Sequence, residues 1–480
     1  MKVPPNIHED SYQELVSAQK EYRNQEECPR LEGNEEIGQL ANRFLNLGGT
    51  SHFLRLNALI FDDTIKNIIA CGYGSHLLEE LAKFEPNMYT HEYAVAMFVM
   101  LCNWDLTPTV IINQQHQNYL DALRTATIAL FKHLFRMPYE LSQFLVLSRT
   151  TEWTTQYRLT IIMWYMEKTE DELVLYTRYW PIVGNFTHLK LWKLCKDEFV
   201  DLSHYLRILD LLERTEIYGL RALPQIKPVV DIMGARLTVF HLGKYRIVRE
   251  LKRYDREVIE ALLNDEHWVE QASALNILIT RKHYESNINI RQDIRMCGLF
   301  SDAYRRICKS DTDISHRVCV ITGVFSAESK KKESLMLEST DITAALMEDL
   351  MRNKNAKMYT SHRPMNLVGF YSKYELEMGP LYAWQHCKYN PRLIFECATR
   401  NHNIFDFFVL VCITSQSIPV AGVILMFDNY KRLVNSNAKF IIIGSDSLAE
   451  YEQLGDRQDV ILFSGVKSTT YHLVKLYMNL

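Results

Sequence analysis

The sequence predicts an α+β protein, with all-α N-terminal and central domains followed by an antiparallel β domain. Two observations predict this class. As far as about residue 290, apolar residues recur three and four positions apart between helix start and stop signals. Beyond residue 366 the segments are short, β-branched and aromatic, and turns separate them. We therefore divide the 480 residues into a helical N-terminal domain (1–125), a helical central domain (126–310) and a β-rich C-terminal domain (311–480).

Three segments in the first quarter carry the signals of complete helices. Residues 35–49 have apolar residues at helical spacing and end in two glycines, which suit a left-handed C-cap. In residues 62–74, Asp62 or Asp63 is the predicted N-cap and Gly72 is the predicted end of the helix. Residues 91–104 are apolar on nearly every face, which predicts a buried central helix.

The helical pattern continues through the middle of the chain. Residues 118–135 and 196–219 are predicted helices. The second has an apolar stripe at intervals of three and four residues, made of Phe199, Leu202, Leu206, Leu209 and Leu212. Acids and bases alternate along residues 248–266, which predicts an amphipathic helix with a solvated face.

The predicted strands lie at residues 317–325, 438–446 and 459–466, together with a strand pair inside residues 402–432. That pair consists of two apolar runs split by a short polar turn at residues 415–419. In both runs the two faces are apolar, and Gly422 allows a close approach at the start of the second run. We expect such strands to be covered on both faces in a sandwich, or to meet another subunit on one face.

Composition and charge favour an ordinary globular protein. The hydrophobic fraction is 47%, the charged fraction is 23% and the net charge is −4. This charge gives no electrostatic reason to expect nucleic acid or an anionic membrane as a partner. Pro4, Pro5 and Glu9 stand where a signal peptide needs an apolar core, and the longest apolar run, at 404–413, carries Asp406. We therefore expect no nucleic-acid and no membrane partner.

Motifs of catalysis and metal binding are absent from the sequence. The ten cysteines form no CxxC pair, and we expect buried free thiols, with one or two disulfides as the alternative. No two of the 16 histidines lie within four residues of each other, and His204 is expected to be a hydrogen-bonded structural histidine. Phosphate-loop, dinucleotide-binding and nucleophile-elbow motifs are also missing. We predict no enzyme, no catalytic, cofactor or metal residues and no small-molecule substrate.

The order of segments resembles the arthropod hemocyanin and hexamerin superfamily. The stretch "RNHNIFDFFVLVCITSQSIPVAGVILMFDNYK" (400–431) resembles a strand pair of that family's terminal β domain. The stretch "SHYLRILDLLERTEIYGLRALP" (203–224) looks like a helix of its central domain, and the sequence pattern of residues 48–100 resembles its helical N-terminal domain. The resemblance implies an immunoglobulin-like β-sandwich at the C-terminus, here shortened, and an oligomer.

The copper ligands of that family are missing. Copper-binding members hold two copper ions with three histidines each, and only His204 falls where such a ligand would sit. Residues 175–180 and 294–306 contain no histidine. Because one ligand cannot hold a binuclear site, the resemblance implies the copper-free branch, the storage hexamerins.

The function predicted on this basis is non-enzymatic nutrient or amino-acid storage, or that of a degenerate relative without oxygen binding. The partner would be another copy of the chain or a related subunit, and the location would be extracellular body fluid. The alternative is an intracellular helical interaction scaffold in the cytoplasm. A copper-dependent phenol oxidase is the third and least favoured hypothesis.

Overall fold

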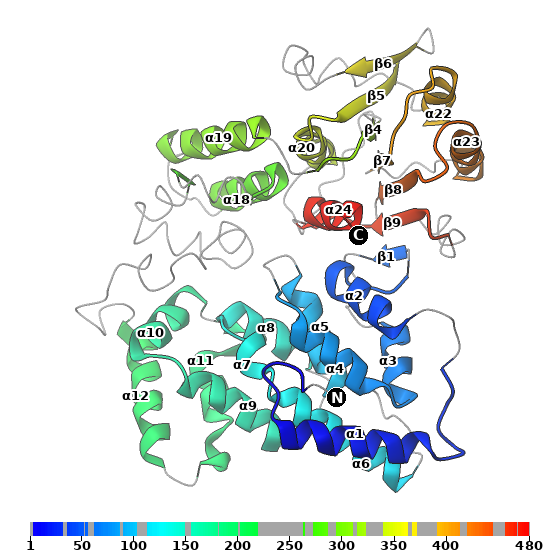
Figure 1. Cartoon of the computed structure of the whole chain (residues 1–480). Helices are drawn as coiled ribbons and strands as arrows, with labels where there is room; N and C mark the ends of the chain where they lie inside the picture. The colour runs from blue at the N-terminus through cyan, green and yellow to red at the C-terminus, as the bar shows by residue number, and fades with distance from the viewer. Residues whose placement is uncertain are drawn as a thin grey trace. The chain divides into compact units, whose positions relative to one another are not determined.

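The computed structural model describes residues 3–31, 36–51, 53–55, 62–86, 90–102, 113–148, 155–180, 182–199, 202–218, 263–264, 272–286, 294–310, 314–322, 339–362, 367–371, 391–412, 420–444, 457–467 and 469–479. The chain folds into two compact units (Figure 1). Unit 1 comprises Met1–Thr50, Leu59–Leu237 and Tyr245–Glu250, and unit 2 comprises Ser51–Ala58, Thr238–Lys244 and Leu251–Leu480. The division into domains at residues 125 and 310 stays a prediction.

Unit 1 consists of helices and one small antiparallel hairpin. Its helices are α1 (Glu9–Arg23), α2 (Ile37–Leu47), α3 (Asp63–Ala70), α4 (Gly74–Lys83), α5 (His91–Leu101), α6 (Gln114–Ile128), α7 (Phe131–Leu134), α8 (Pro138–Leu147), α9 (Thr155–Met166), α10 (Glu170–Tyr179), α11 (His188–Lys193), η1 (Lys196–Glu198) and α12 (Leu202–Tyr218). The hairpin pairs β2 (Ile182–Val183) with β3 (Phe186–Thr187). Helix α5 packs against α2, α3, α4, α6, α7 and α8. Ten of its 11 residues are buried, which confirms the predicted central helix.

The helix ends in the first quarter follow from the predicted caps. Gly48 ends α2 with a φ of +81°, and a Cβ at this position would overlap the ring of Tyr93. The carboxylate of Asp62 accepts hydrogen bonds from the backbone N–H groups of Thr64 (2.9 Å) and Ile65 (3.3 Å) at the start of α3. Gly72 follows α3 with a φ of +74°. These three positions were correctly predicted.

The apolar stripe predicted for α12 is wrong in register. Of the predicted stripe, Leu202 and Leu206 are 44% and 55% exposed and Leu212 is buried, whereas Tyr205, Ile208 and Leu211, which lie outside it, are buried. The buried residues recur at the same three- and four-residue spacing, displaced by one position, so the sequence pattern alone allowed both faces. His204 was expected to be a hydrogen-bonded structural histidine; it is exposed, and its Nδ1 lies 3.5 Å from Oγ of the neighbouring Ser203. Of the helix predicted at 248–266, only residues 263–264 are described.

Unit 2 contains a seven-stranded sheet in the order β1–β9–β8–β7–β4–β5–β6. The strands are β1 (Phe53–Arg55), β4 (Val318–Thr322), β5 (Ala356–His362), β6 (Leu367–Tyr371), β7 (Phe407–Cys412), β8 (Lys439–Gly444) and β9 (Val460–Ser464). Every neighbouring pair is parallel except β5 and β6. The helices are α18 (Ala274–Ser286), α19 (Ile294–Lys309), α20 (Ser339–Met351), α22 (Pro391–Arg400), α23 (Val420–Leu433) and α24 (Thr470–Asn479).

The predicted antiparallel, immunoglobulin-like sandwich is therefore wrong. The second run of the expected strand pair, from Val420 onward, is helix α23. The physical reason is the direction of the strands: β7 and β8 are parallel neighbours, so the chain must cross back over the sheet between them. Gly422 lies in this helix, and a Cβ there would overlap the guanidinium of Arg392. The strands predicted at 317–325, 438–446 and 459–466 are present as β4, β8 and β9.

Helices cover both faces of the sheet of unit 2 (Figure 1). On one face, Phe408 of β7 contacts Phe395 of α22 and Tyr430 of α23. On the other, the ring of Phe407 lies 6.4 Å from that of Tyr477 on α24. All six residues of β7 are buried, which explains why both faces of this strand are apolar. Among the described residues, no helix is long and apolar enough to cross a membrane.

Substitutions on α23 distinguish a helix from a strand at this position. A strand would place Val423, Leu425 and Phe427 on one face, but in the helix Val423 and Phe427 are buried and Leu425 is 63% exposed. We predict that Val423→Asp unfolds unit 2 because it buries an unpaired charge, and that Leu425→Asp changes the free energy of unfolding by less than about 0.5 kcal/mol. Urea denaturation followed by circular dichroism measures both. Equal damage from the two variants would contradict the helix.

Candidate functional site

The carboxyl edge of a parallel sheet is the usual place for a ligand in a doubly covered α/β unit. In unit 2 the segments that follow β4, β7 and β8 at this edge lie outside the described residues. Within the described part of the chain, no group of three or more His, Cys, Asp and Glu side chains is placed to hold a metal ion. The expectation of no catalytic, cofactor or metal residues stays a prediction.

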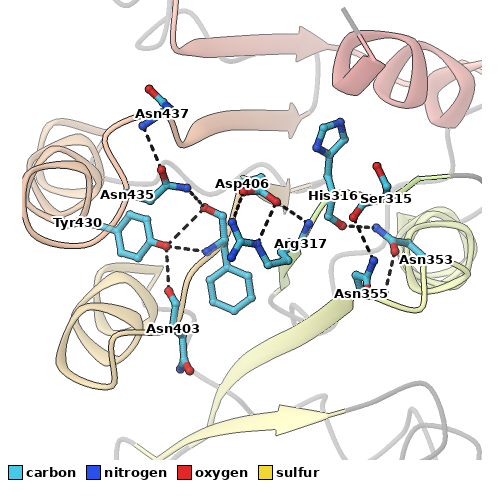
Figure 2. Close-up of polar contacts among 11 residues, drawn as sticks. Ser315, His316, Arg317, Asn353, Asn355, Asn403, Asp406, Tyr430, Asn435 and Asn437 are labelled. Atoms are coloured by element: carbon cyan, nitrogen blue, oxygen red, sulfur yellow. Dashed lines mark hydrogen bonds and ion pairs between the residues drawn. The ribbon is translucent and has the colours of Figure 1, made fainter.

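The opposite, amino edge of the sheet carries a polar network (Figure 2). The carboxylate of Asp406 accepts hydrogen bonds from the backbone N–H (2.8 Å), Nε (3.1 Å) and Nη2 (2.6 Å) of Arg317. The guanidinium holds the pKa of this carboxyl below its usual range. The backbone carbonyl of Asp406 accepts from Lys439 N–H at 2.9 Å. These bonds align the first residues of β4, β7 and β8.

The other side chains of this network bind backbone groups. The Tyr430 hydroxyl donates to the carbonyl of Asn403 and accepts from Phe405 N–H, both at 2.8 Å. Asn435, Asn353 and Asn355 donate from their side-chain amides to backbone carbonyls at 2.8–3.0 Å. Because these groups hold neighbouring chain segments together, we interpret the network as an anchor of the fold and not as a ligand site.

A second buried polar group joins α18 to α20. The Asp349 carboxylate accepts hydrogen bonds from Ala274 N–H (2.7 Å) and Leu275 N–H (3.3 Å) at the start of α18. Nη1 of Arg352 lies 3.7 Å from the same carboxylate and donates to the carbonyl of Ala272 at 3.0 Å. Asp349 is completely buried, and this burial raises its pKa to about 7 although Arg352 and the two amides lower it. The group is an internal cap with no exposed surface.

Unit 1 presents a surface with the chemistry of a ligand contact. It consists of Arg23, the last residue of α1, with Tyr73 and His76 at the start of α4, and we call it the Arg23–Tyr73 surface. The guanidinium carbon of Arg23 lies 4.0 Å from the centre of the Tyr73 ring, and Nη2 donates to the Tyr73 hydroxyl at 2.8 Å. The ring centres of Tyr73 and His76 are 5.9 Å apart. Arg23 is exposed, and the two rings are half-buried.

The backbone under this surface leaves space for the side chain of Arg23. Gly72 has a φ of +74°, and a Cβ there would come within 2.7 Å of Cγ of Arg23. The absent side chain leaves room for the arginine stem against the turn. Within the described part of the chain, no carboxylate forms an ion pair with Arg23. Its charge is therefore exposed to solvent next to the rings of Tyr73 and His76.

Tyrosines from α1 and α6 hold the turn beneath this surface. The Tyr119 hydroxyl donates to the carbonyl of Ile69 (3.0 Å) and accepts from Gly74 N–H (2.9 Å). The Tyr22 hydroxyl donates to the carbonyl of Ala70 at 2.9 Å. The Tyr22 ring stacks on those of His116 (4.6 Å) and Tyr119 (5.4 Å), and burial lowers the pKa of His116, which favours its neutral form.

The sequence did not identify this surface. Gly72 was predicted as the end of a helix, and residues 71–73 connect α3 to α4. Arg23 lies 50 positions before Tyr73, so no local motif contains both. The one local feature that could have indicated this surface is Gly72 followed by the aromatic Tyr73 at the start of a helix. This combination is too common in proteins to identify a binding surface. His204, the one residue singled out from the copper pattern, is distant in sequence from the surface and lies exposed on α12.

Comparison with known proteins gives two similarities. No protein-family model matches the chain. The chain is 24% identical over 263 residues to the RNA-binding protein RO60 of Caenorhabditis elegans, in an alignment that covers 49% of this chain and 39% of that protein. The chain thus matches about two fifths of the length of this curated relative. Its fold is similar to the crystal structure of the Deinococcus radiodurans RO (RSR) protein, with a TM-score of 0.58 and 13% identity, covering 92% of this chain and 100% of that one.

These similarities overturn the resemblance to hemocyanins and hexamerins. The storage function, the extracellular location and the phenol oxidase alternative rested on that family and are wrong with it. The generic helical scaffold also finds no support. The exclusion of nucleic acid is contradicted by a relative named for RNA binding. That exclusion relied on the net charge of −4, which is a sum over 480 residues and does not show where individual cations lie. The prediction that the chain is not an enzyme agrees with this similarity, because the relative is named for binding RNA.

The buried cap at Asp349 predicts a specific pH dependence. The pKa of Asp349 in the folded chain lies above its usual value, so the folded state binds the proton more tightly than the unfolded state. The protonated carboxyl therefore stabilises the folded state. This contribution is complete below about pH 4 and is lost as the pH rises through about 7. We predict that the free energy of unfolding of wild-type unit 2 falls by about 1–4 kcal/mol across this range through Asp349. Asp349→Asn removes that component.

Urea unfolding at several pH values between about 5 and 8 measures this effect. Asp302→Asn is the matched control, since Asp302 is 60% exposed and pairs with Arg305 on the surface of α19. Its stability curve should run parallel to that of the wild type. A curve for Asp349→Asn that also runs parallel would show that Asp349 does not titrate in this range.

Proposed function

We propose that the chain is a non-enzymatic RNA-binding protein and that the Arg23–Tyr73 surface of unit 1 contacts unpaired RNA. The observation that carries the proposal is the similarity to a protein named for RNA binding. The arrangement of Arg23, Tyr73 and His76 supports it, because a guanidinium beside two half-buried rings offers both a charge for phosphate and planes for stacking.

The geometry favours unpaired nucleotides over duplex. A base can stack on a guanidinium or aromatic plane only when its own face is accessible, and bases inside a duplex are already stacked. Arg23 is exposed, and its guanidinium carbon lies 4.0 Å from the centre of the Tyr73 ring, so a base would approach it from the side away from this ring. The tyrosine hydroxyl fixes the orientation of the guanidinium through the 2.8 Å hydrogen bond.

The electrostatic contribution from this surface should be small. The net charge of −4 provides no long-range attraction for a polyanion. Each phosphate neutralised on a single strand contributes a slope of about −0.7 to the dependence of log affinity on log salt. Binding through one arginine and stacked bases should therefore lose little affinity as salt increases, unlike binding to an extended basic groove.

We predict that Arg23→Ala and Tyr73→Ala each weaken binding of a fluorescein-labelled oligouridine by about tenfold, the loss expected for one stacked base. Arg23→Lys should lose most of the same affinity, because the ammonium keeps the charge but has no plane. Fluorescence anisotropy measures the dissociation constants, and circular dichroism checks the fold.

The matched control is Arg214→Ala. Arg214 also lies on a helix of unit 1 and is 51% exposed, but it pairs with Asp210 at 2.8 Å. Its removal should leave the affinity unchanged. Wild-type affinity in Arg23→Ala would remove this surface from the proposal, and absence of RNA binding by the wild-type chain would contradict the function itself.

A further inference from the structure

Two cysteines far apart in the sequence meet at the edge of unit 1. Cys28 lies in the connection after α1, and Cys71 is the C-cap of α3. Sγ of Cys28 is 3.7 Å from the carbonyl oxygen of Cys71, and Sγ of Cys71 is 3.7 Å from Oδ1 of Asn67. Burial, and after it the charge of Cys28, raise the pKa of the Cys71 thiol.

Cys195 and Cys397 each form a local hydrogen bond, to a residue four positions away. Sγ of Cys195 donates to the carbonyl of Leu191 at 3.5 Å, and Sγ of Cys397 accepts from Nδ2 of Asn401 at 3.3 Å. The contact of Cys28 instead reaches a second cysteine across 43 positions of the chain. Cys28 is half-buried and Cys71 is buried, so Cys28 is the more accessible of the two to a reagent.

We propose that Cys28 and Cys71 form a reversible disulfide when the chain meets a disulfide oxidant such as oxidised glutathione. The Cys28 thiolate attacks one sulfur of the oxidant, which forms a mixed disulfide and releases one glutathione thiolate. The Cys71 thiolate then attacks the Cys28 sulfur and releases the second glutathione. Two protein thiols are oxidised, one glutathione disulfide is reduced to two thiols, and the two protons pass to the released glutathione.

The surroundings set the rate of this exchange. Burial raises the pKa of both thiols, although Arg23 and the Tyr22 hydroxyl lower that of Cys28. The thiolate fractions are therefore small at neutral pH, and the exchange should accelerate as the pH rises toward the thiol pKa values. The pair is a slow responder to oxidation and not a rapid redox sensor.

The bond would tie the end of α1 to the end of α3. It would close the loop that contains α2, and so restrict the unfolded chain. The same segments carry Arg23 and Tyr73, since Arg23 ends α1 and Gly72 and Tyr73 directly follow Cys71. The inference does not depend on the proposed RNA binding, because the disulfide can form whether or not RNA is a ligand.

Peptide mapping of the native full chain tests the proposal. The protein is incubated with oxidised glutathione at about pH 8, free thiols are blocked with N-ethylmaleimide, and the digest is analysed without reduction by mass spectrometry. We expect a peptide linking Cys28 to Cys71, a loss of two of the ten thiols, and a melting temperature about 5 °C higher than that of the reduced chain. Dithiothreitol should reverse all three.

Variants separate the bond from unrelated oxidation. Cys28→Ser should abolish the linked peptide and the rise in melting temperature, and Cys397→Ser, the control at another half-buried cysteine, should retain both. Cys71→Ser should stop the reaction at the Cys28–glutathione adduct. A wild-type chain that accumulates this adduct without the internal link, or that pairs Cys28 with a different cysteine, would overturn the proposal.

Discussion

Burial of strand β7 on both faces is the constraint on which unit 2 depends. A strand covered on both sides cannot alternate apolar and polar residues, and all six residues from Phe407 to Cys412 are buried. Its neighbours β4 and β8 run parallel to it, so each connection must cross the sheet and bring a helix with it. The polar network of Arg317 and Asp406 then aligns the strands at their amino edge, where backbone groups would otherwise lose their partners.

Unit 1 depends on a different interaction, the stack of Tyr22, His116 and Tyr119. These rings fill the space between α1 and α6, and two of their hydroxyls bind backbone groups at the end of α3 and the start of α4. Burial thereby places rigid aromatic residues beneath the exposed Arg23 and the half-buried Tyr73. A contact surface supported in this way loses little conformational entropy when a ligand binds.

The sequence predicted the local structure better than the fold. The caps at Gly48 and Asp62, the buried helix α5 and the strands β4, β8 and β9 follow from residue spacing and turn chemistry, which act over a few residues. The run from Val420 to Phe427 was read as a strand because a short apolar run has no distinctive period. Whether such a run is helix or strand depends on the direction of β8, which local spacing does not contain.

The candidate surface was missed for a similar reason. Arg23 and Tyr73 approach each other only because α1 packs beside α4 and α6, and Gly72 leaves room for the arginine stem. The search for copper ligands instead directed attention to His204, which the structure leaves exposed on α12. Net charge misled for a physical reason as well, since recognition of unpaired bases rests on a few planar groups and not on total charge.

The central claim is that RNA contacts unit 1 at the turn between α3 and α4. Photocrosslinking tests it most directly: the wild-type chain is irradiated with an oligonucleotide containing 4-thiouridine, digested, and analysed by mass spectrometry for RNA-linked peptides. The account predicts an adduct on the peptide that contains Tyr73 and His76, or on the one that contains Arg23. Adducts confined to peptides of unit 2 would contradict it.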